Sequence, residues 1–140
     1  SSKKALLEAL AERTLALAEE DFAAMEQAPE GASAYYINSS TPDNSPFDRS
    51  LIALSRLAQS NNELAQQTMA RIQDGWHALV LAEIGDEQIA RAVLLLGDGM
   101  YYNAAFGGGA TNPQTADMLK SDRAALERAL KVLKAAVAAD

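Results

Sequence analysis

Apolar residues recur at helical spacing along nearly the whole chain, in segments that turn-forming residues separate. The first segment, Ser2–Gln27, has a glutamate-rich polar face and ends at the Ala-Pro-Glu-Gly sequence of residues 28–31. Its predicted apolar stripe consists of Leu6, Leu7, Leu10, Leu17, Phe22 and Met25. This spacing predicts one long helix, about 35–40 Å in length at 1.5 Å per residue. A short helix or turn is expected at 32–39.

Capping residues mark the helices in the middle of the chain. After an irregular connection rich in Ser, Pro, Asp and Asn, Ser45 precedes Pro46, which is typical of a cap followed by the first helical residue. This helix is expected to reach about residue 59. Asn61 or Asn62 caps the next helix, which extends to about residue 83 and ends at Gly85.

The stretch 86–109, DEQIARAVLLLGDGMYYNAAFGGG, is the element around which the rest of the chain is expected to pack. It reads as a helix that is apolar on nearly every side, with an acidic cap and a terminal glycine run. A helix that is apolar all round is buried on all sides. In so short a chain, this predicts that the fold covers one flank and a second subunit covers the other.

A last helix begins at Asn112-Pro113, and its apolar residues follow a nearly heptad spacing. Two long neighbouring helices of this kind are what each subunit contributes to a four-helix-bundle dimer. We therefore predict a twofold homodimer built on residues 86–106 and 113–138. The predicted interface residues are Ile89, Val93, Leu96, Met100, Leu119, Leu126, Leu130, Leu133 and Val137.

Composition narrows the class of protein. Of the 140 residues, 49% are hydrophobic, and Ala and Leu are abundant, which favours an all-α domain spanning 1–140. The net charge of −7 and the lack of a basic cluster argue against direct binding to nucleic acid. The absence of cysteine excludes disulfides and thiolate sites and agrees with a cytoplasmic location. No apolar run is long enough to predict a membrane span, and the charged, amphipathic start is not a signal peptide.

Two motifs resemble the TetR family of transcriptional regulators. The opening Ser-Lys-Lys-Ala-Leu-Leu of residues 2–7 resembles the segment that follows the helix-turn-helix in that family, although Lys4 stands where an acidic residue is commoner. Residues 90–92 and 97–102, Ala-Arg-Ala and Gly-Asp-Gly-Met-Tyr-Tyr, are similar to its penultimate helix. The resemblance implies the ligand-binding and dimerisation half of a cytoplasmic bacterial repressor. It also implies a DNA-binding domain that lies outside this sequence, before Ser1.

A set of aromatic, apolar and polar side chains is expected to line a ligand cavity between the helices. Such cavities are mostly apolar with a few polar groups. The candidates are Phe22, Tyr35, Tyr36, Phe47, Met69, Ile72, Trp76, Asp98, Tyr101, Tyr102 and Asn103. For each aromatic residue, the alternative is an ordinary place in the core.

Asp98 is the sharpest of these candidates, because a carboxylate within an apolar helix is costly unless it is paired or hydrogen-bonded. Arg91 precedes it by seven residues and Tyr102 follows it by four. One interpretation is an aspartate that a tyrosine hydroxyl, a cap or the partner subunit satisfies. The other is a polar anchor for an amine or hydroxyl of a ligand.

The remaining motifs do not predict an enzyme, a metal site or a cofactor. His77 is the single histidine, so Asp74-x-x-His77 has no second half to complete a di-metal bundle. We expect His77 to be partly exposed, or hydrogen-bonded near the rim of the pocket. No Ser/His/Asp set or carboxylate pair suggests acid–base catalysis. Gly107-Gly108-Gly109 lacks the strand and the Lys of a phosphate loop and is interpreted as a helix end.

The sequence thus predicts an effector-sensing and homodimerising domain for a small apolar or aromatic molecule, which would contact DNA only through the additional domain. Two alternatives stay open. One is a stand-alone helical dimer that binds or carries a small molecule without a DNA partner. The other is a structural dimer whose core is filled, and the presence of a cavity near Trp76 distinguishes it from the first two.

Overall fold

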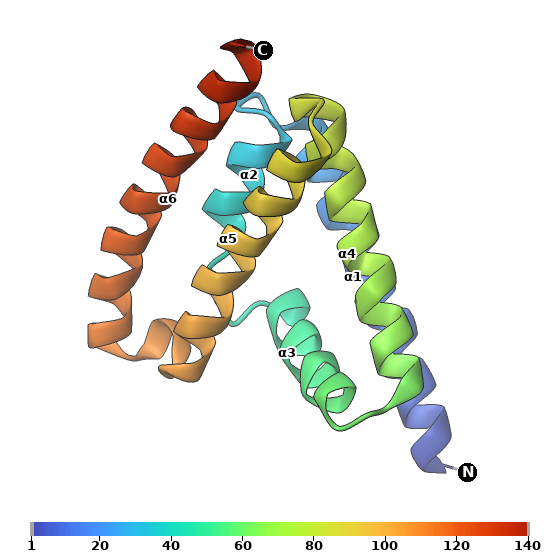
Figure 1. Ribbon diagram of the computed structural model, residues 1–140. Helices are drawn as coiled ribbons and strands as arrows, with labels where there is room; N and C mark the ends of the chain where they lie inside the picture. The colour runs from blue at the N-terminus through green and yellow to red at the C-terminus, as the bar shows by residue number, and fades with distance from the viewer. Residues whose placement is uncertain (1, 140) are drawn as a thin grey trace.

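The computed structural model describes residues 2–139, which are folded into six α-helices and a short 3-10 helix, with no strand (Figure 1). The elements are α1 (Ser2–Gln27), α2 (Ala32–Ser39), α3 (Pro46–Gln59), α4 (Glu63–Ile84), α5 (Glu87–Phe106), η1 (Gly109–Thr111) and α6 (Pro113–Ala139). The prediction of an all-α fold is confirmed.

The predicted caps explain where the helices begin and end. Side-chain oxygens of Ser45, Asn62 and Asp86 accept hydrogen bonds from the third amide nitrogen that follows each of them, at 3.1, 2.9 and 3.0 Å. These bonds satisfy amide groups that a helix leaves without partners in its first turn. Gly85 ends α4 with a φ of 79°, a left-handed conformation that glycine adopts without steric cost.

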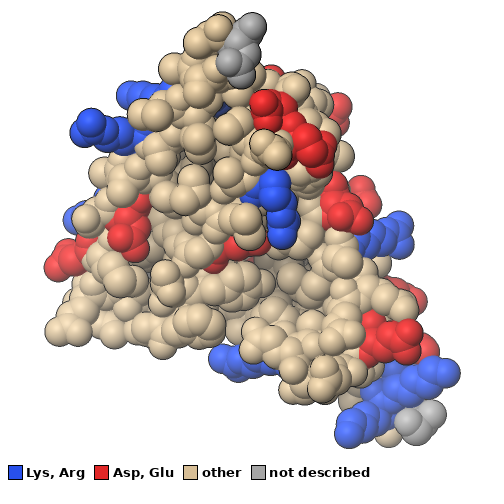
Figure 2. All heavy atoms as spheres, viewed as in Figure 1, with Lys and Arg blue, Asp and Glu red and all other residues tan. Residues whose placement is uncertain are grey.

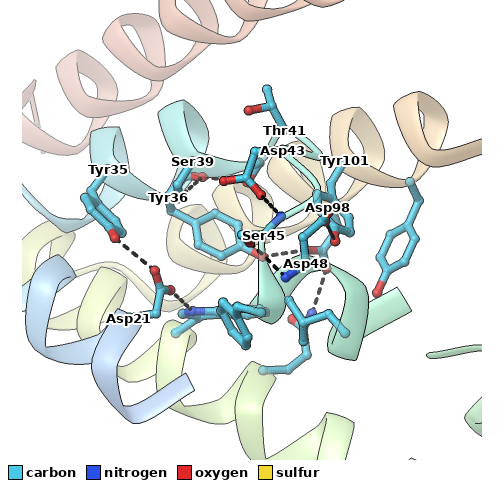
Figure 3. Close-up of a pocket in the computed structure, with 16 residues that line it drawn as sticks. Asp21, Tyr35, Tyr36, Ser39, Thr41, Asp43, Ser45, Asp48, Asp98 and Tyr101 are labelled. Atoms are coloured by element: carbon cyan, nitrogen blue, oxygen red, sulfur yellow. Dashed lines mark hydrogen bonds between the residues drawn. The ribbon is translucent and has the colours of Figure 1, made fainter. Parts of the chain in front are cut away.

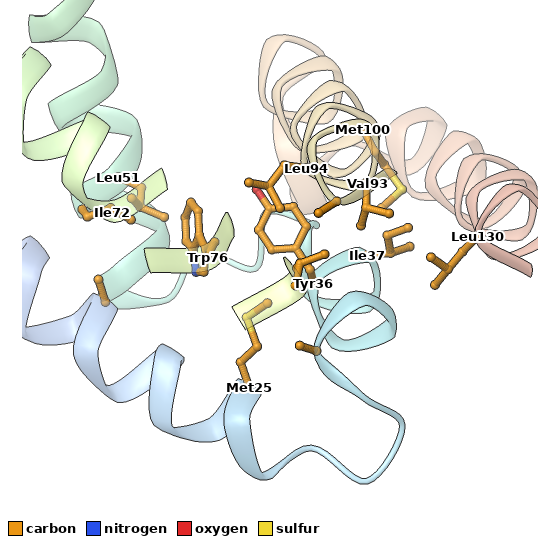
Figure 4. Close-up of a cluster of buried hydrophobic side chains, with 14 of the residues drawn as sticks. Met25, Tyr36, Ile37, Leu51, Ile72, Trp76, Val93, Leu94, Met100 and Leu130 are labelled. Carbon is orange, nitrogen blue, oxygen red and sulfur yellow. The ribbon is translucent and has the colours of Figure 1, made fainter. Parts of the chain in front are cut away.

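Helix α4 packs against α1, α2, α3 and α5 (Figure 1). On the other side of the molecule, α6 lies along α5 and also contacts α2. The core therefore runs from α1 through α4 and α2 to α6. Figure 4 shows this continuity, with Leu51 and Ile72 at one end, Trp76 and Tyr36 in the middle above Met25, and Ile37 beside Leu130 at the other end.

The face that α1 buries differs from the predicted stripe. Leu6 is 72% exposed, and Leu7, Leu10 and Leu17 are only half-buried. The buried positions are Ala11, Thr14, Ala18 and Met25, most of them small. Small side chains let neighbouring helices approach closely, and the larger leucines lie at the edges of that contact.

Several predicted dimer contacts are wrong, because the side chains are buried within the protomer itself. Val93, Met100, Leu119 and Leu130 belong to its core. The reason is α2, which packs against both α5 and α6 and takes up their inner stripe. The other predicted contacts, all half-buried, are Ile89, Leu96, Leu126, Leu133 and Val137.

Glu83 joins three helices through its carboxylate. It accepts hydrogen bonds from the amide and hydroxyl of Ser33 on α2, both at 2.8 Å, and it pairs with Nζ of Lys134 on α6 at 2.7 Å. Burial by itself would raise the pKa of Glu83, but the bonds from Lys134 and Ser33 outweigh it, so the pKa is lowered. The ionised carboxylate therefore stabilises the fold.

Replacing Glu83 with glutamine is expected to lower the free energy of unfolding at neutral pH by about 1–2 kcal/mol, because the bonds become neutral and the site is partly exposed. A group whose pKa is lowered on folding contributes stability above its unfolded value, about 4.3, and loses that contribution as the pH falls through its folded value. The difference between the two proteins should therefore shrink below about pH 4, measured by urea denaturation across the acid range.

The matched control is Glu19→Gln, the same change on the exposed face of α1. It should leave the stability within about 0.5 kcal/mol of the unchanged chain. A Glu83→Gln effect that is equally small, or that does not depend on pH, would contradict the role given to this carboxylate.

Candidate ligand-binding site

A cavity of about 260 Å³ lies where α1 to α5 and the α2–α3 connection meet (Figure 3). Its wall combines six aromatic rings, four aspartates and several neutral groups. The aromatic residues are Tyr35, Tyr36, Phe47, Trp76, Tyr101 and Tyr102. The aspartates are Asp21, Asp43, Asp48 and Asp98, and the neutral groups include Ser39, Ser40, Thr41, Ser45, Leu51 and Gln73. The cavity is thus an aromatic space with an unusual share of carboxylates.

The structure brings seven of the eleven predicted site residues together in this wall, namely the six aromatic residues and Asp98. It places the other four outside. Ile72 is fully buried in the core, and Phe22 packs edge-on against Trp76 with ring centroids 6.4 Å apart. Met69 packs half-buried against the core, and Asn103 is exposed. None of the four is part of the cavity wall, so these four predictions are corrected.

Asp98 on α5 accepts its hydrogen bonds from side chains on two other helices, α2 and α4. It accepts hydrogen bonds from the hydroxyl of Tyr36 and from Nε2 of Gln73, the latter at 3.1 Å. Tyr102, which follows Asp98 by four residues on the same helix, is not among its hydrogen-bond partners. Burial raises the pKa of Asp98, although the bonds from Tyr36 and Gln73 and the charge of Arg91 oppose the rise. A tyrosine does satisfy this carboxylate, but the net change in its pKa is still upward.

Tyr36 can reach Asp98 because the facing position on α5 is a glycine. A Cβ atom on Gly97 would lie 2.6 Å from the Tyr36 ring and 2.8 Å from Oγ of Ser40. Ser40 in turn donates to the carbonyl of Tyr36 at 2.5 Å. Burial and the neighbouring Asp98 raise the pKa of Tyr36 well above its ordinary value, so the hydroxyl remains a donor.

Asp21 connects α1 to the cavity. Its two carboxylate oxygens accept hydrogen bonds from the hydroxyl of Tyr35 at 2.9 Å and from Nε1 of Trp76 at 2.8 Å. Figure 3 shows the hydroxyl of Tyr35 directed at this carboxylate. Burial together with the bond to Asp21 raises the pKa of Tyr35 to about 12. Among the residues that the structure describes, Asp21 is the one α1 residue in the cavity wall.

Asp48 supplies a third bonded carboxylate from the first turn of α3. It accepts hydrogen bonds from the hydroxyl of Tyr101 and, at 3.0 Å, from the amide of Asn44. Burial and the bond to Asp48 raise the pKa of Tyr101. Its position in the first turn of α3 also places the carboxylate near the unpaired amides of the helix N-terminus, which favours an acidic side chain there.

The sequence interpretation missed Asp21 and Asp48. Asp21 had a detectable signal: together with the buried residues Ala11, Thr14, Ala18 and Met25 it completes a run spaced three, four, three and four residues apart. Asp48 had none, since an acidic residue in the first turn of a helix is common on exposed surfaces.

His77 is partly exposed, one of the two positions expected for it, and it does not line the cavity. Its Nε2 is 2.7 Å from Oε1 of Glu87, in a separate groove between α4 and α5. Within residues 2–139, no group of three or more potential ligands is arranged to hold a metal ion. The glycines after α5 lead into η1, where Gly108 adopts a left-handed φ of 96°.

The fold and this cavity define a class of protein: an all-α bundle whose helices enclose a ligand-sized aromatic space. Residues 30–133 match the family described as "Tetracyclin repressor-like, C-terminal domain". The chain belongs to this family, as its sequence motifs implied. Comparison with curated proteins and with solved structures gave no match. None of the helices within 2–139 combines the length and the apolar character needed to cross a bilayer.

Proposed function

We propose that this chain is the effector-sensing and homodimerising domain of a TetR-like bacterial transcriptional regulator that acts in the cytoplasm. The family supports a regulatory, non-enzymatic domain. The observation that carries the proposal is that a small-molecule cavity reaches α1 through Asp21. Under this hypothesis, the regulator contacts DNA only through a further domain that precedes α1.

Coupling between the ligand and α1 then follows from the bonds of Asp21. Tyr35 on α2 and Trp76 on α4 hold this carboxylate, and both also line the cavity. A ligand that moves either ring, or that contacts Asp21 itself, changes the position that α1 prefers. Allosteric coupling of about 1–3 kcal/mol corresponds to a 5–150-fold change in affinity for DNA.

The alternative function is a dimeric carrier that binds a small molecule without any DNA partner. The cavity itself is compatible with that function. The two differ in what happens to α1, because a carrier has no need for a ligand to displace it. The position of α1 with and without ligand therefore decides between them.

The test is a ligand screen read out by thermal stability and by fluorescence of Trp76, the single tryptophan. A compound at about 100 times its Kd should add about 2.7 kcal/mol of stability. It should also change the emission of Trp76, whose ring lines the cavity. A broad library of metabolites and drug-like aromatics that yields no such compound would contradict the proposal.

Movement of α1 can be measured with spin labels, because the chain contains no native cysteine. Arg13→Cys on α1 and Glu63→Cys on α4 place labels at exposed positions of two packed helices. In samples diluted with unlabelled chain, a bound hit should shift the distance distribution between the labels. An unchanged distribution would favour the carrier.

A further inference from the structure

All the charged side chains in the cavity wall are acidic. Four aspartates line it, and among residues 2–139 no lysine, arginine or histidine does. We propose that the effector of this domain is an organic cation, an amine or quaternary ammonium attached to a small aromatic or aliphatic body. This inference rests on the proposed function and names the chemistry of the ligand at the same site.

The donors that hold the aspartates leave their charge in place. Asp21, Asp48 and Asp98 are bound by tyrosine hydroxyls, an indole, an amide side chain and a backbone amide. All of these donors are neutral. None of the three carboxylates forms an ion pair within the described part of the chain. A buried charge without an opposite charge is costly, and a bound cation would remove that cost.

The nearby arginines form no ion pair with these three carboxylates. Arg49 donates to the carbonyl of Asn44 at 2.5 Å, and Arg123 lies 3.4 Å from the hydroxyl of Thr41. Arg91 lowers the pKa of Asp98 through its charge, but its side chain lines the groove that also contains His77. None of these three arginines lines the cavity. The carboxylates in its wall are therefore available to a positively charged ligand.

The aromatic rings suit the same kind of ligand. A cation within about 6 Å of a ring centroid is attracted by the negative face of the ring, most strongly by tryptophan. Trp76 lies at the centre of this wall, with ring centroids 5.4 Å from Tyr36 and 6.2 Å from Phe47. Rings from α2, α3 and α4 thus meet around one space, as Figure 3 shows for Tyr36 and its neighbours.

An unpaired acceptor lies in the same wall. Gln73 donates from Nε2 to Asp98, while its Oε1 is buried and accepts no hydrogen bond among the residues described. The N–H groups of a protonated amine beside Asp98 would donate to its carboxylate and to Oε1 of Gln73, satisfying an acceptor that is otherwise costly to bury. A quaternary ammonium would interact through its charge alone. The raised pKa of Asp98 points the same way, because a neighbouring cation favours the ionised form.

A neutral apolar or aromatic effector, which the sequence also allowed, fits this wall less well than a cation. It would exclude water from carboxylates that have no counter-ion, which raises the cost of their burial. A cation instead gains Coulomb attraction in a site of low dielectric constant. The cavity volume of about 260 Å³ suits a molecule of one ring and a short ammonium-bearing arm.

The test compares four probes of similar size by isothermal titration calorimetry at low ionic strength. They are phenethylammonium and benzyltrimethylammonium as cations, 2-phenylethanol as a neutral molecule, and phenylacetate as an anion. The cations should bind at least about tenfold more tightly than the alcohol, a difference of 1.4 kcal/mol. Added salt should weaken the cations and leave the alcohol unchanged.

Variants separate the cavity from the general acidity of the chain. Asp98→Asn should reduce the affinity for the cations about tenfold and change that for the alcohol by less than about twofold. Asp48→Asn should act in the same direction, and it serves if the first variant does not fold. The matched control Asp117→Asn makes the same change of charge at an exposed position of α6 and should leave all affinities unchanged.

Each outcome decides one proposal. Equal binding of the alcohol and the cations, or an equal loss of cation affinity in Asp98→Asn and Asp117→Asn, would overturn the assignment to cations while the sensing function stands. So would a library that yields only neutral ligands of this cavity. If neither the four probes nor the library gives any ligand, the sensing function falls, and this inference falls with it.

Discussion

Replacing Trp76 with alanine is expected to lower the free energy of unfolding by about 3–5 kcal/mol, the range for removing a large aromatic side chain from a core. The indole is buried and packs against Phe22, Tyr36 and Phe47 from three different helices. Its Nε1 also donates to Asp21, so the change leaves a carboxylate oxygen without its donor. Both losses act at the point where α1, α2, α3 and α4 meet.

The measurement is urea denaturation followed by far-UV circular dichroism, because the variant has lost its single tryptophan. The protomer concentration must be held constant, since the stability of a dimer depends on it. Trp76→Phe separates the two contributions: it keeps most of the ring packing and should cost about half as much.

The control for this prediction is Leu6→Ala, a change at a side chain that is 72% exposed on α1. It should alter the stability by no more than about 0.5 kcal/mol. If Trp76→Ala costs less than about 1 kcal/mol, Trp76 is not the centre of the packing described here, and the link from the cavity to α1 loses its support.

The helices could be predicted well because their boundaries depend on neighbouring residues in the sequence. Ser45 with Pro46, Asn62, Asp86 and Gly85 begin or end helices through bonds within one turn, or through a backbone angle of a single residue. Each of these helix ends can therefore be recognised from a few consecutive residues. They remain valid whatever the helix later packs against.

Which face of a helix is buried depends instead on its neighbours. The apolar stripe of α6 suggested a partner subunit, but Leu119 and Leu130 are buried in the protomer, where α2 and α5 pack against α6. On α1, small residues form the contact, and the hydrophobic stripe of leucines lies beside it. Hydrophobic periodicity identifies a buried face only where one neighbour covers it.

The cavity shows the same division. Its aromatic residues were predictable, because large rings with polar ends are typical of ligand sites. The partners of its carboxylates were not, since Tyr35 meets Asp21 across 14 residues, Tyr36 meets Asp98 across 62, and Tyr101 meets Asp48 across 53. Which hydroxyl reaches which carboxylate depends on how the helices pack. The number of carboxylates in the cavity wall, and hence its negative charge, could therefore not be predicted from the sequence.

A shallow apolar groove between α5 and α6, on the side away from α2, is the surface where we expect a partner subunit to bind. It is lined by Ala92, Leu95, Leu96, Ala125, Arg128, Ala129, Val132 and Leu133. Figure 2 shows that α5 and α6 present a largely uncharged surface in this view, with most charged side chains towards its margins. Alanines in such a groove let helices of a second subunit approach closely, as a four-helix bundle requires.

Leu95→Glu combined with Val132→Glu is expected to convert the proposed homodimer into a folded monomer. These side chains are 54% and 61% exposed in the protomer, so the change should leave its helical content intact. In a dimer with an interface of about 1,600 Å² or more, the same change would bury unpaired carboxylates. The dissociation constant should rise at least about a hundredfold, equivalent to about 2.8 kcal/mol.

Sedimentation equilibrium and circular dichroism together test this prediction, with Leu6→Glu as the control. That change adds the same charge at an exposed leucine of α1, outside the groove, and should leave the dimer intact. A double variant that remains dimeric would place the interface elsewhere, and an unchanged chain that is monomeric at high concentration would remove the dimer from the proposal. If only the double variant dissociates, the outer faces of α5 and α6 form the interface, because their inner faces are already occupied by α2.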